Sequence, residues 1–293
     1  MALGPNGAIF VGSRRSEGGF IRWEILRIVR DGMVSVFATL DPAVSPGAPG
    51  LLNLALDPAG VVYAALASFN PSTHGVWQVN RDGTAIVRLP GSEGIPFPNA
   101  LVFGPNDNLY ITDSTGAIWR VGRDGVAHEW VRHALLLQRI RTTPSCRRLV
   151  RTGLPSRRRK RCMSQIPNRG LIARITLGAD GSPGPLQVVA EGFSLLTIDG
   201  IAMDVRGEIH GVVAGFALLG TDPLVRVEPS TGTIRSTPTI AAAFDVPLSI
   251  AFGAGPWDHS TVFVTNGALP IGVPGPGPGV VQAEVGVPGF IGR

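Results

Sequence analysis

Hydrophobic and polar positions alternate in short runs along most of this chain. Apolar runs at 109–112, 117–121 and 126–131 are separated by turns, the second of them an Arg-Asp-Gly sequence at 123–125. The same order recurs in 76–79, an Arg-Asp-Gly at 81–83, and 86–89. Short strands joined by Asp-Gly turns are typical of antiparallel meanders. The pattern therefore predicts an all-β chain.

A longer pattern repeats along the chain. It reads L-N-L-A-L-D-P-A-G-V-V-Y from Leu52, N-A-L-V-F-G-P-N-D-N-L-Y from Asn99 and D-G-I-A-M-D-V-R-G-E-I-H from Asp199. A looser copy starts at Leu248, and residues 1–10 fit the pattern without its first two positions. A four-strand repeat of about 40–50 residues is the signature of a propeller blade.

We therefore expect a single domain over 1–293, folded as a six-bladed β-propeller, with blade 1 incomplete and blade 4 disrupted. The structural alternative is a β-sandwich. The predicted blades lie near 1–45, 46–92, 93–134, 135–193, 194–243 and 244–293.

Charge is concentrated in one segment. Ten of the 26 basic residues lie within 139–161, both cysteines lie within 146–162, and no acidic residue occurs between Glu129 and Asp180. Without this run, 16 basic residues would face 21 acidic ones. A cationic run can bind nucleic acid or acidic lipid, but this one has no interleaved aromatic residues. The spacing of Cys146 and Cys162 does not match a zinc site. We expect no nucleic-acid partner and no membrane partner.

The motifs around Asn99 and Asp199, with the tail G-V-V-Q-A-E-V-G-V-P-G, resemble the gluconolactonase/regucalcin family. The resemblance implies a six-bladed propeller that holds one divalent cation, usually Ca²⁺, and often hydrolyses lactones. It implies that Asp199 is a metal ligand and can serve as the catalytic base, and that Asn99 binds substrate. Asp113 is a further candidate for substrate binding. The alternative is a purely structural role, in which Asn99 and Asp199 cap turns where blades begin.

Two ligands that the resemblance implies are missing. The first-blade Glu would stand two positions before Met1, and the middle-blade Asn should come from a G-A-N-G-(V/I)-A-F segment that does not occur. If each codon is taken from the last base of one codon and the first two of the next, the genetic code allows 149–156 to be read as G-A-N-G-V-A-F and 161–168 as L-Y-V-A-N-T-E. We therefore hypothesise that 138–167 is translated out of frame.

Two functional interpretations follow. The first is a metal-dependent, gluconolactonase-like hydrolase that is inactive or impaired in this chain; the second is a non-catalytic, NHL-like propeller that binds a ligand or a protein. We expect a small-molecule substrate such as a lactone, a monomer, and an exposed, poorly ordered loop over 138–167, because unpaired guanidinium groups are costly to bury. No signal peptide is visible, which gives a cytoplasmic location by default.

Overall fold

A computed structural model describes most of the chain. The described residues are 1–4, 6–17, 20–40, 48–84, 86–104, 107–137, 149–151, 160–166, 169–237, 239–267 and 275–290. They divide into two compact units, Met1–Ala134 and Leu135–Arg293. Both units are built from strands, and the one α-helix in the described part, α1 (Phe216–Leu219), has four residues. Among these residues no helix has the length and apolar character that a membrane crossing requires.

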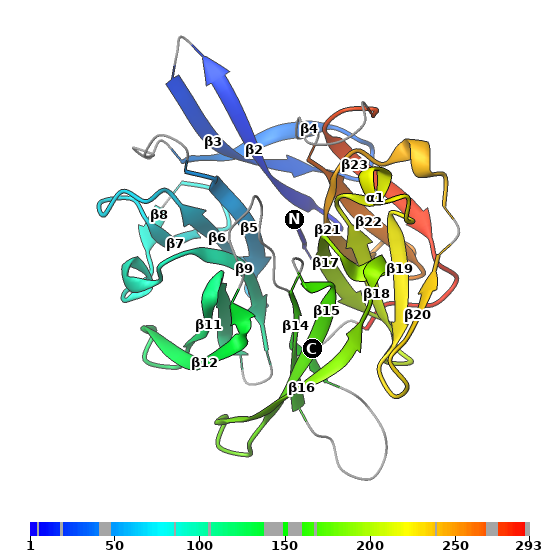
Figure 1. Ribbon diagram of the computed structural model, residues 1–293. Helices are drawn as coiled ribbons and strands as arrows, with labels where there is room; N and C mark the ends of the chain where they lie inside the picture. Colours follow the sequence, from blue (N-terminus) through cyan, green and yellow to red (C-terminus); the bar gives the residue numbers. More distant parts are fainter. Residues whose placement is uncertain are drawn as a thin grey trace. The chain divides into compact units, whose positions relative to one another are not determined.

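Unit 1 contains three four-stranded sheets (Figure 1). The first sheet consists of β1 (Ala2–Leu3), β2 (Ile9–Glu17), β3 (Phe20–Ile28) and β4 (Val34–Leu40). The second consists of β5 (Gly50–Leu56), β6 (Val62–Ala67), β7 (Gly75–Val79) and β8 (Ile86–Arg88). The third consists of β9 (Pro98–Phe103), β10 (Leu109–Asp113), β11 (Thr115–Val121) and β12 (Ala127–Leu137), whose last residues pass the unit boundary.

Unit 2 contains two four-stranded sheets and one with three strands. The fourth sheet of the chain consists of β13 (Leu149–Arg151), β14 (Lys160–Ile166), β15 (Leu171–Leu177) and β16 (Pro183–Glu191). The fifth consists of β17 (Ile198–Met203), β18 (Ile209–Val213), β19 (Leu224–Glu228) and β20 (Thr233–Ser236). The sixth consists of β21 (Pro247–Phe252), β22 (Thr261–Asn266) and β23 (Gly279–Glu284).

Every sheet is an antiparallel meander in which strands adjacent in sequence are also adjacent in space. The Asp-Gly turns produce this order locally. In the β7–β8 turn the N–H of Gly83 donates to the carbonyl of Asn80 over 2.8 Å, and Gly83 has a φ of 78°. The side chain of Asp82 accepts from the N–H of Thr84 at 3.0 Å. Glycine takes a positive φ at little steric cost, so the turn residues select the hairpin.

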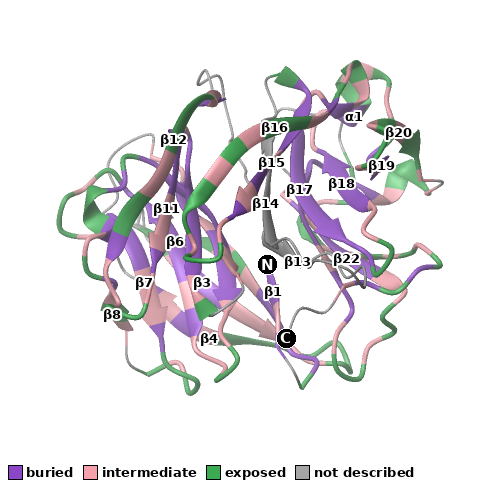
Figure 2. Cartoon of the chain, turned by 90° about the horizontal axis from the view of Figure 1, so that it is seen from below, coloured by how far each residue is buried: buried purple, intermediate pink, exposed green. Residues whose placement is uncertain are grey.

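The hydrophobic core lies between consecutive sheets within each unit. Phe10 and Ile25 of the first sheet pack with Leu54 and Val62 of the second. In unit 2 the strands β17 and β18 are buried along their whole length, whereas the outer strands β16 and β20 contain many exposed residues. The same is true of β12, the outer strand of the third sheet (Figure 2). Burial thus falls from the inner strands of a sheet toward its outer edge, as expected for a stack of blades.

The all-β, propeller-like fold predicted from the repeat is confirmed. The described residues contain five complete four-stranded sheets, and the sixth sheet has three strands, so the six-bladed ring itself stays a prediction. An incomplete first blade was expected, but the first sheet has four strands; its first strand, β1, spans two residues and pairs with Ile9 and Phe10.

The prediction of an exposed loop throughout 138–167 is wrong for two stretches. The backbone of β13 pairs with β14, and β14 pairs with β15 from Arg161↔Thr176 to Ile166↔Leu171. Main-chain hydrogen bonding does not depend on side-chain identity, so an arginine-rich sequence can still occupy a ladder. Positions 138–148, 152–159 and 167 lie outside the described residues.

Candidate functional site

A β-bulge interrupts the first strand of four sheets at the same repeat position. In β9, Pro98 pairs with Asp113 and Leu101 with Ile111, so that two residues of β9 oppose one of β10. The pairing of β17 with β18 shifts between Ile198 and Ile201. Strands β5 and β21 show the same shift around Leu52 and Leu248. Bulges re-aim side chains and often lie beside active sites.

Asn99 lies in the bulge of β9 and is 2 % exposed. Its Nδ2 donates to Oγ of Ser114 at 3.0 Å, which fixes the orientation of the amide. Within the described part of the chain its Oδ1 has no hydrogen-bond partner. The bulge is held by side chains on both sides: Oγ1 of Thr112 accepts from the N–H of Ala100 at 3.0 Å, and Oδ1 of Asn53 accepts from the N–H of Leu101 at 3.3 Å.

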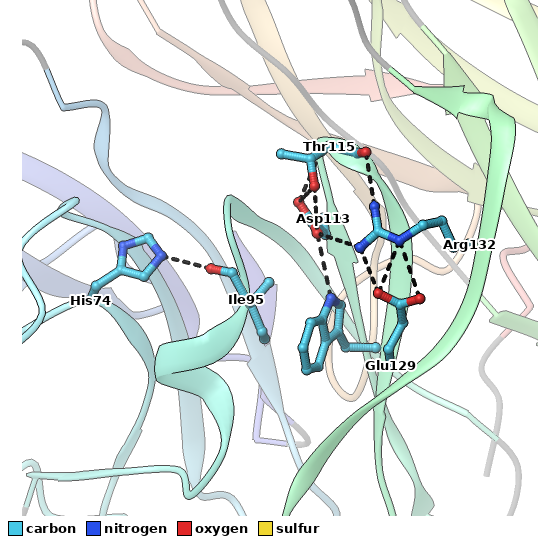
Figure 3. Close-up of polar contacts among 7 residues, drawn as sticks. His74, Ile95, Asp113, Thr115, Glu129 and Arg132 are labelled. Carbon is cyan, nitrogen blue, oxygen red and sulfur yellow. Dashed lines mark hydrogen bonds and ion pairs between the residues drawn. The ribbon is translucent and has the colours of Figure 1, made fainter.

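Asp113 is also buried, with 1 % of its surface exposed, but its carboxylate is occupied by its own sheet. Oδ1 accepts from the N–H of Thr115 at 2.8 Å, and the Thr115 hydroxyl contacts both carboxylate oxygens. Oδ2 accepts from Nε1 of Trp119 at 3.4 Å and lies 3.9 Å from Nη2 of Arg132 (Figure 3). Arg132 is held in turn by Glu129 and donates to the carbonyl of Thr115 at 3.2 Å.

Asp199 lies in the bulge of β17 and is 6 % exposed. The neighbouring Gly200 packs closely on β21: a Cβ there would lie 2.8 Å from the backbone nitrogen of Ile250. Thr197, just before the strand, has a φ of 62°, and Val246 before β21 has a φ of 51°. Positive φ is strained for β-branched residues, and such strain is characteristic of functional sites.

The structure thus brings Asn99 and Asp113 onto paired strands of one sheet, while Asp199 belongs to the other unit. Asn99 and Asp199 do not cap turns, as the purely structural alternative expected, because both residues are inside strands at bulges. Their roles in binding and catalysis, like that of Asp113, stay predictions.

Sequence reasoning missed the polar groups that support the bulges. Asn53, Thr112 and Ser114 are buried, and no motif distinguishes them from ordinary strand residues. Five buried side-chain atoms have no hydrogen-bond partner among the described residues, and sequence reasoning missed two of them that lie on β21 and β22, Oγ of Ser249 and Oδ1 of Asn266. Asn266 ends β22 as Asp113 ends β10, so aligning the second strands of the repeats could have identified it.

The candidate residues have the oxygen ligands that a hard cation prefers, but among the described residues too few of them come together to hold one. Carboxylate and amide oxygens are the ligands that Ca²⁺ prefers, and Asp199 and Asn99 supply one of each. Across the described ranges, however, no three His, Cys, Asp or Glu side chains come together in a way that could hold a metal ion. We therefore derive no chemical step through a bound cation.

Comparisons with known proteins support the fold. No protein-family model matches the sequence, and no curated protein matches it. Among solved structures, a protein of Lactobacillus plantarum is 16 % identical over 90 % of this chain and 76 % of its own, with a TM-score of 0.52. A Bacteroides fragilis protein described as a candidate 6-phosphogluconolactonase is 12 % identical over 96 % and 80 %, with a TM-score of 0.50.

An auxiliary nutrient-binding protein of Bacteroides ovatus is 10 % identical over 83 % of this chain, with a TM-score of 0.53. The match covers 63 % of that protein, which is less than two thirds of its length. At these identities the similarities define a class by fold alone: proteins with propeller-like all-β architecture.

Proposed function

We propose that this chain is a gluconolactonase-like hydrolase with six blades, and that its functional residues are among those at the bulges of the inner strands. The observation that carries the proposal is that Asn99 and Asp199, polar and buried, occupy the same repeat position within a bulge, where β5 and β21 carry leucine. A similarity of fold to a candidate lactonase agrees with this proposal.

As the family resemblance implies, Asp199 would be the residue that holds a cation and accepts a proton from water, and Asn99 would be the residue that orients the substrate. Asp113 is a weaker candidate for substrate binding, because Thr115, Trp119 and Arg132 already engage its carboxylate.

The proposal includes impairment. The middle-blade Asn that the resemblance implies is absent from the printed sequence, and the alternative frame would restore it beside Arg151. A site that lacks an oxygen ligand should bind Ca²⁺ orders of magnitude more weakly than a complete one.

The test is calcium titration calorimetry combined with pH-stat hydrolysis of a simple lactone. We expect weak Ca²⁺ binding that is lost in Asp199→Asn and kept in the control Asp107→Asn, an exposed residue with a φ of 58° that asparagine tolerates. A protein rebuilt in the alternative frame over 138–167 should bind Ca²⁺ at least tenfold more tightly and hydrolyse the lactone faster.

The alternative is a propeller that binds a ligand without chemistry. A rebuilt protein that neither binds Ca²⁺ nor hydrolyses lactones would refute the hydrolase proposal and favour this alternative. Equal Ca²⁺ affinity in Asp199→Asn and the unmodified protein would refute the role of Asp199.

A further inference from the structure

A second concave site lies in unit 1, away from the bulges. It is a cavity of about 380 Å³ between the first sheet and the turns of the second. Leu56, the last residue of β5, lines it, whereas the bulge of that strand lies near its start. The cavity and the bulge are therefore at opposite ends of β5. The volume falls in the range of small-molecule sites, about 300–1,000 Å³.

Two arginines supply the charge of this cavity. Arg27 of β3 is the direct cross-strand partner of Phe10, so both side chains point to the same face of the first sheet. Arg81 comes from the β7–β8 turn and lies over Gly60, with its Nε 3.6 Å from the place that a Cβ on Gly60 would occupy. Across the described residues, neither guanidinium has a hydrogen bond or a carboxylate partner.

The acidic groups closest in sequence to the cavity accept hydrogen bonds within their own turns. Oδ1 of Asp57, in the β5–β6 turn, accepts from the N–H of Val61 at 2.9 Å. Oδ1 of Asp82, beside Arg81, accepts from the N–H and hydroxyl of Thr84. Two unpaired cations that line one cavity repel each other, and an anion between them would remove that repulsion.

The remaining wall is apolar. Phe10 and Phe37 meet edge to face with ring centroids 4.9 Å apart, and Leu56 lies beside them in the lining. An inorganic anion would leave these surfaces without a partner. A ligand that joins an anionic head to an apolar group would use both parts of the wall.

We propose that this cavity binds a small organic anion, in which a carboxylate or phosphate is attached to an aromatic or aliphatic group. Arg27 and Arg81 bind the head, and Phe10, Phe37 and Leu56 contact the apolar part. The site is independent of the proposed hydrolytic site and does not require Asp199 or a cation.

Fluorescence titration with 8-anilinonaphthalene-1-sulfonate tests this proposal, with the uncharged N-phenyl-1-naphthylamine as the matched probe. The variants are Arg27→Gln, Arg81→Gln and the double variant. The matched control is Arg123→Gln, because Arg123 stands in the same Arg-Asp-Gly turn of the next sheet, is exposed and does not line the cavity. Circular dichroism melting checks that each variant is folded.

We expect one saturable site for the sulfonate, about tenfold weaker in each single variant and weaker still in the double variant. The affinity of Arg123→Gln for the sulfonate should equal that of the unmodified protein. The affinity for the uncharged probe should be the same in all variants. Phenylacetate and phenyl phosphate should displace the sulfonate, and the stronger of the two identifies the preferred head group, while benzyl alcohol should not displace it.

Three results would overturn the proposal: no saturable binding to the unmodified protein, equal affinity in the folded double variant, or an equal loss in Arg123→Gln. Arg81 is an exposed turn residue with no bonding partner in the part of the chain that the structure describes, so Arg81→Gln is expected to fold. It keeps the test decisive even if Arg27→Gln does not fold.

Discussion

His210 and Asp204 form a buried pair, in which Nε2 of the imidazole lies 3.1 Å from Oδ2 of the carboxylate. His210 is on β18 and Asp204 follows β17, so the pair joins two strands of one sheet. The other carboxylate oxygen accepts from the N–H groups of Arg206 and Glu208. The Phe252 ring meets the imidazole edge to face at 5.2 Å. The pair is therefore a structural element of the fifth sheet.

This pair predicts acid sensitivity. Burial by itself raises the pKa of Asp204, but the hydrogen bond and charge of His210 and the two backbone N–H groups outweigh burial and leave the pKa lowered. A carboxyl with a lowered folded-state pKa stabilises the protein above its unfolded value of about 3.9, and this contribution is lost as the pH falls through the folded value.

We expect Asp204→Asn to lower stability at pH 7 by about 1.5–3 kcal/mol, the range for hydrogen bonds to a charged group. The loss should shrink as the pH drops below about 4. Urea unfolding at a series of pH values measures this dependence. An Asp204→Asn protein whose destabilisation is the same at pH 3 and pH 7 would contradict the assignment.

Position 50 requires glycine for two reasons, its positive φ and the close approach of the Trp23 ring. Its φ is 83°, and an added Cβ would lie 2.0 Å from Cζ2 of Trp23. Gly32 has a φ of 85° with open space around it, and it is the matched control. We expect Gly32→Ala to cost about 1–2 kcal/mol and Gly50→Ala to cost several kcal/mol, because a core ring must move. Equal melting temperatures for the two variants would show that Trp23 is easily displaced.

Asn53 connects the second and third sheets through the N–H of Leu101. We expect Asn53→Ala to cost about 1–3 kcal/mol, because it leaves a buried N–H unpaired. Hydrogen exchange at the amide of Leu101 should become faster, while that of Ile111 should change no more than global stability does. Unchanged protection at Leu101 would mean that the side chain of Asn53 is not its partner.

Asp113 is expected to be important for stability. Asp113→Ala removes the acceptor used by Thr115 and Trp119, and we expect it to cost about 2–3 kcal/mol by thermal or urea unfolding. Coupling to Arg132 should be small, about 0.2–1 kcal/mol in a double-mutant cycle, because Arg132 is about half exposed. A stable Asp113→Ala protein with an altered KM for lactone would instead support a role in substrate binding.

The frame hypothesis is tested on DNA. Sequencing the gene across codons 138–167 should find an extra base and a missing base that compensate each other. An unbroken reading frame with the printed sequence would contradict the hypothesis, and the arginine run would then be native.

The sequence by itself determined the strands, their turns and the repeat. Asp82-Gly83 and Asp124-Gly125 select hairpins through local backbone geometry, and the recurring apolar pattern places Asn99 and Asp199 at equivalent positions. These features depend on residues close in the chain, so a linear pattern is enough to reveal them.

Tertiary structure alone decided what those positions do. A bulge exists only between two paired strands, the carboxylate of Asp113 meets Arg132 only when β12 is paired in the third sheet, and Arg27 and Arg81 share a cavity only because two sheets are neighbours. The charge of 139–161 predicted a loop, yet the backbone of β14 pairs with β15. Main-chain pairing and long-range contacts depend on where strands lie in space, which side-chain patterns do not specify.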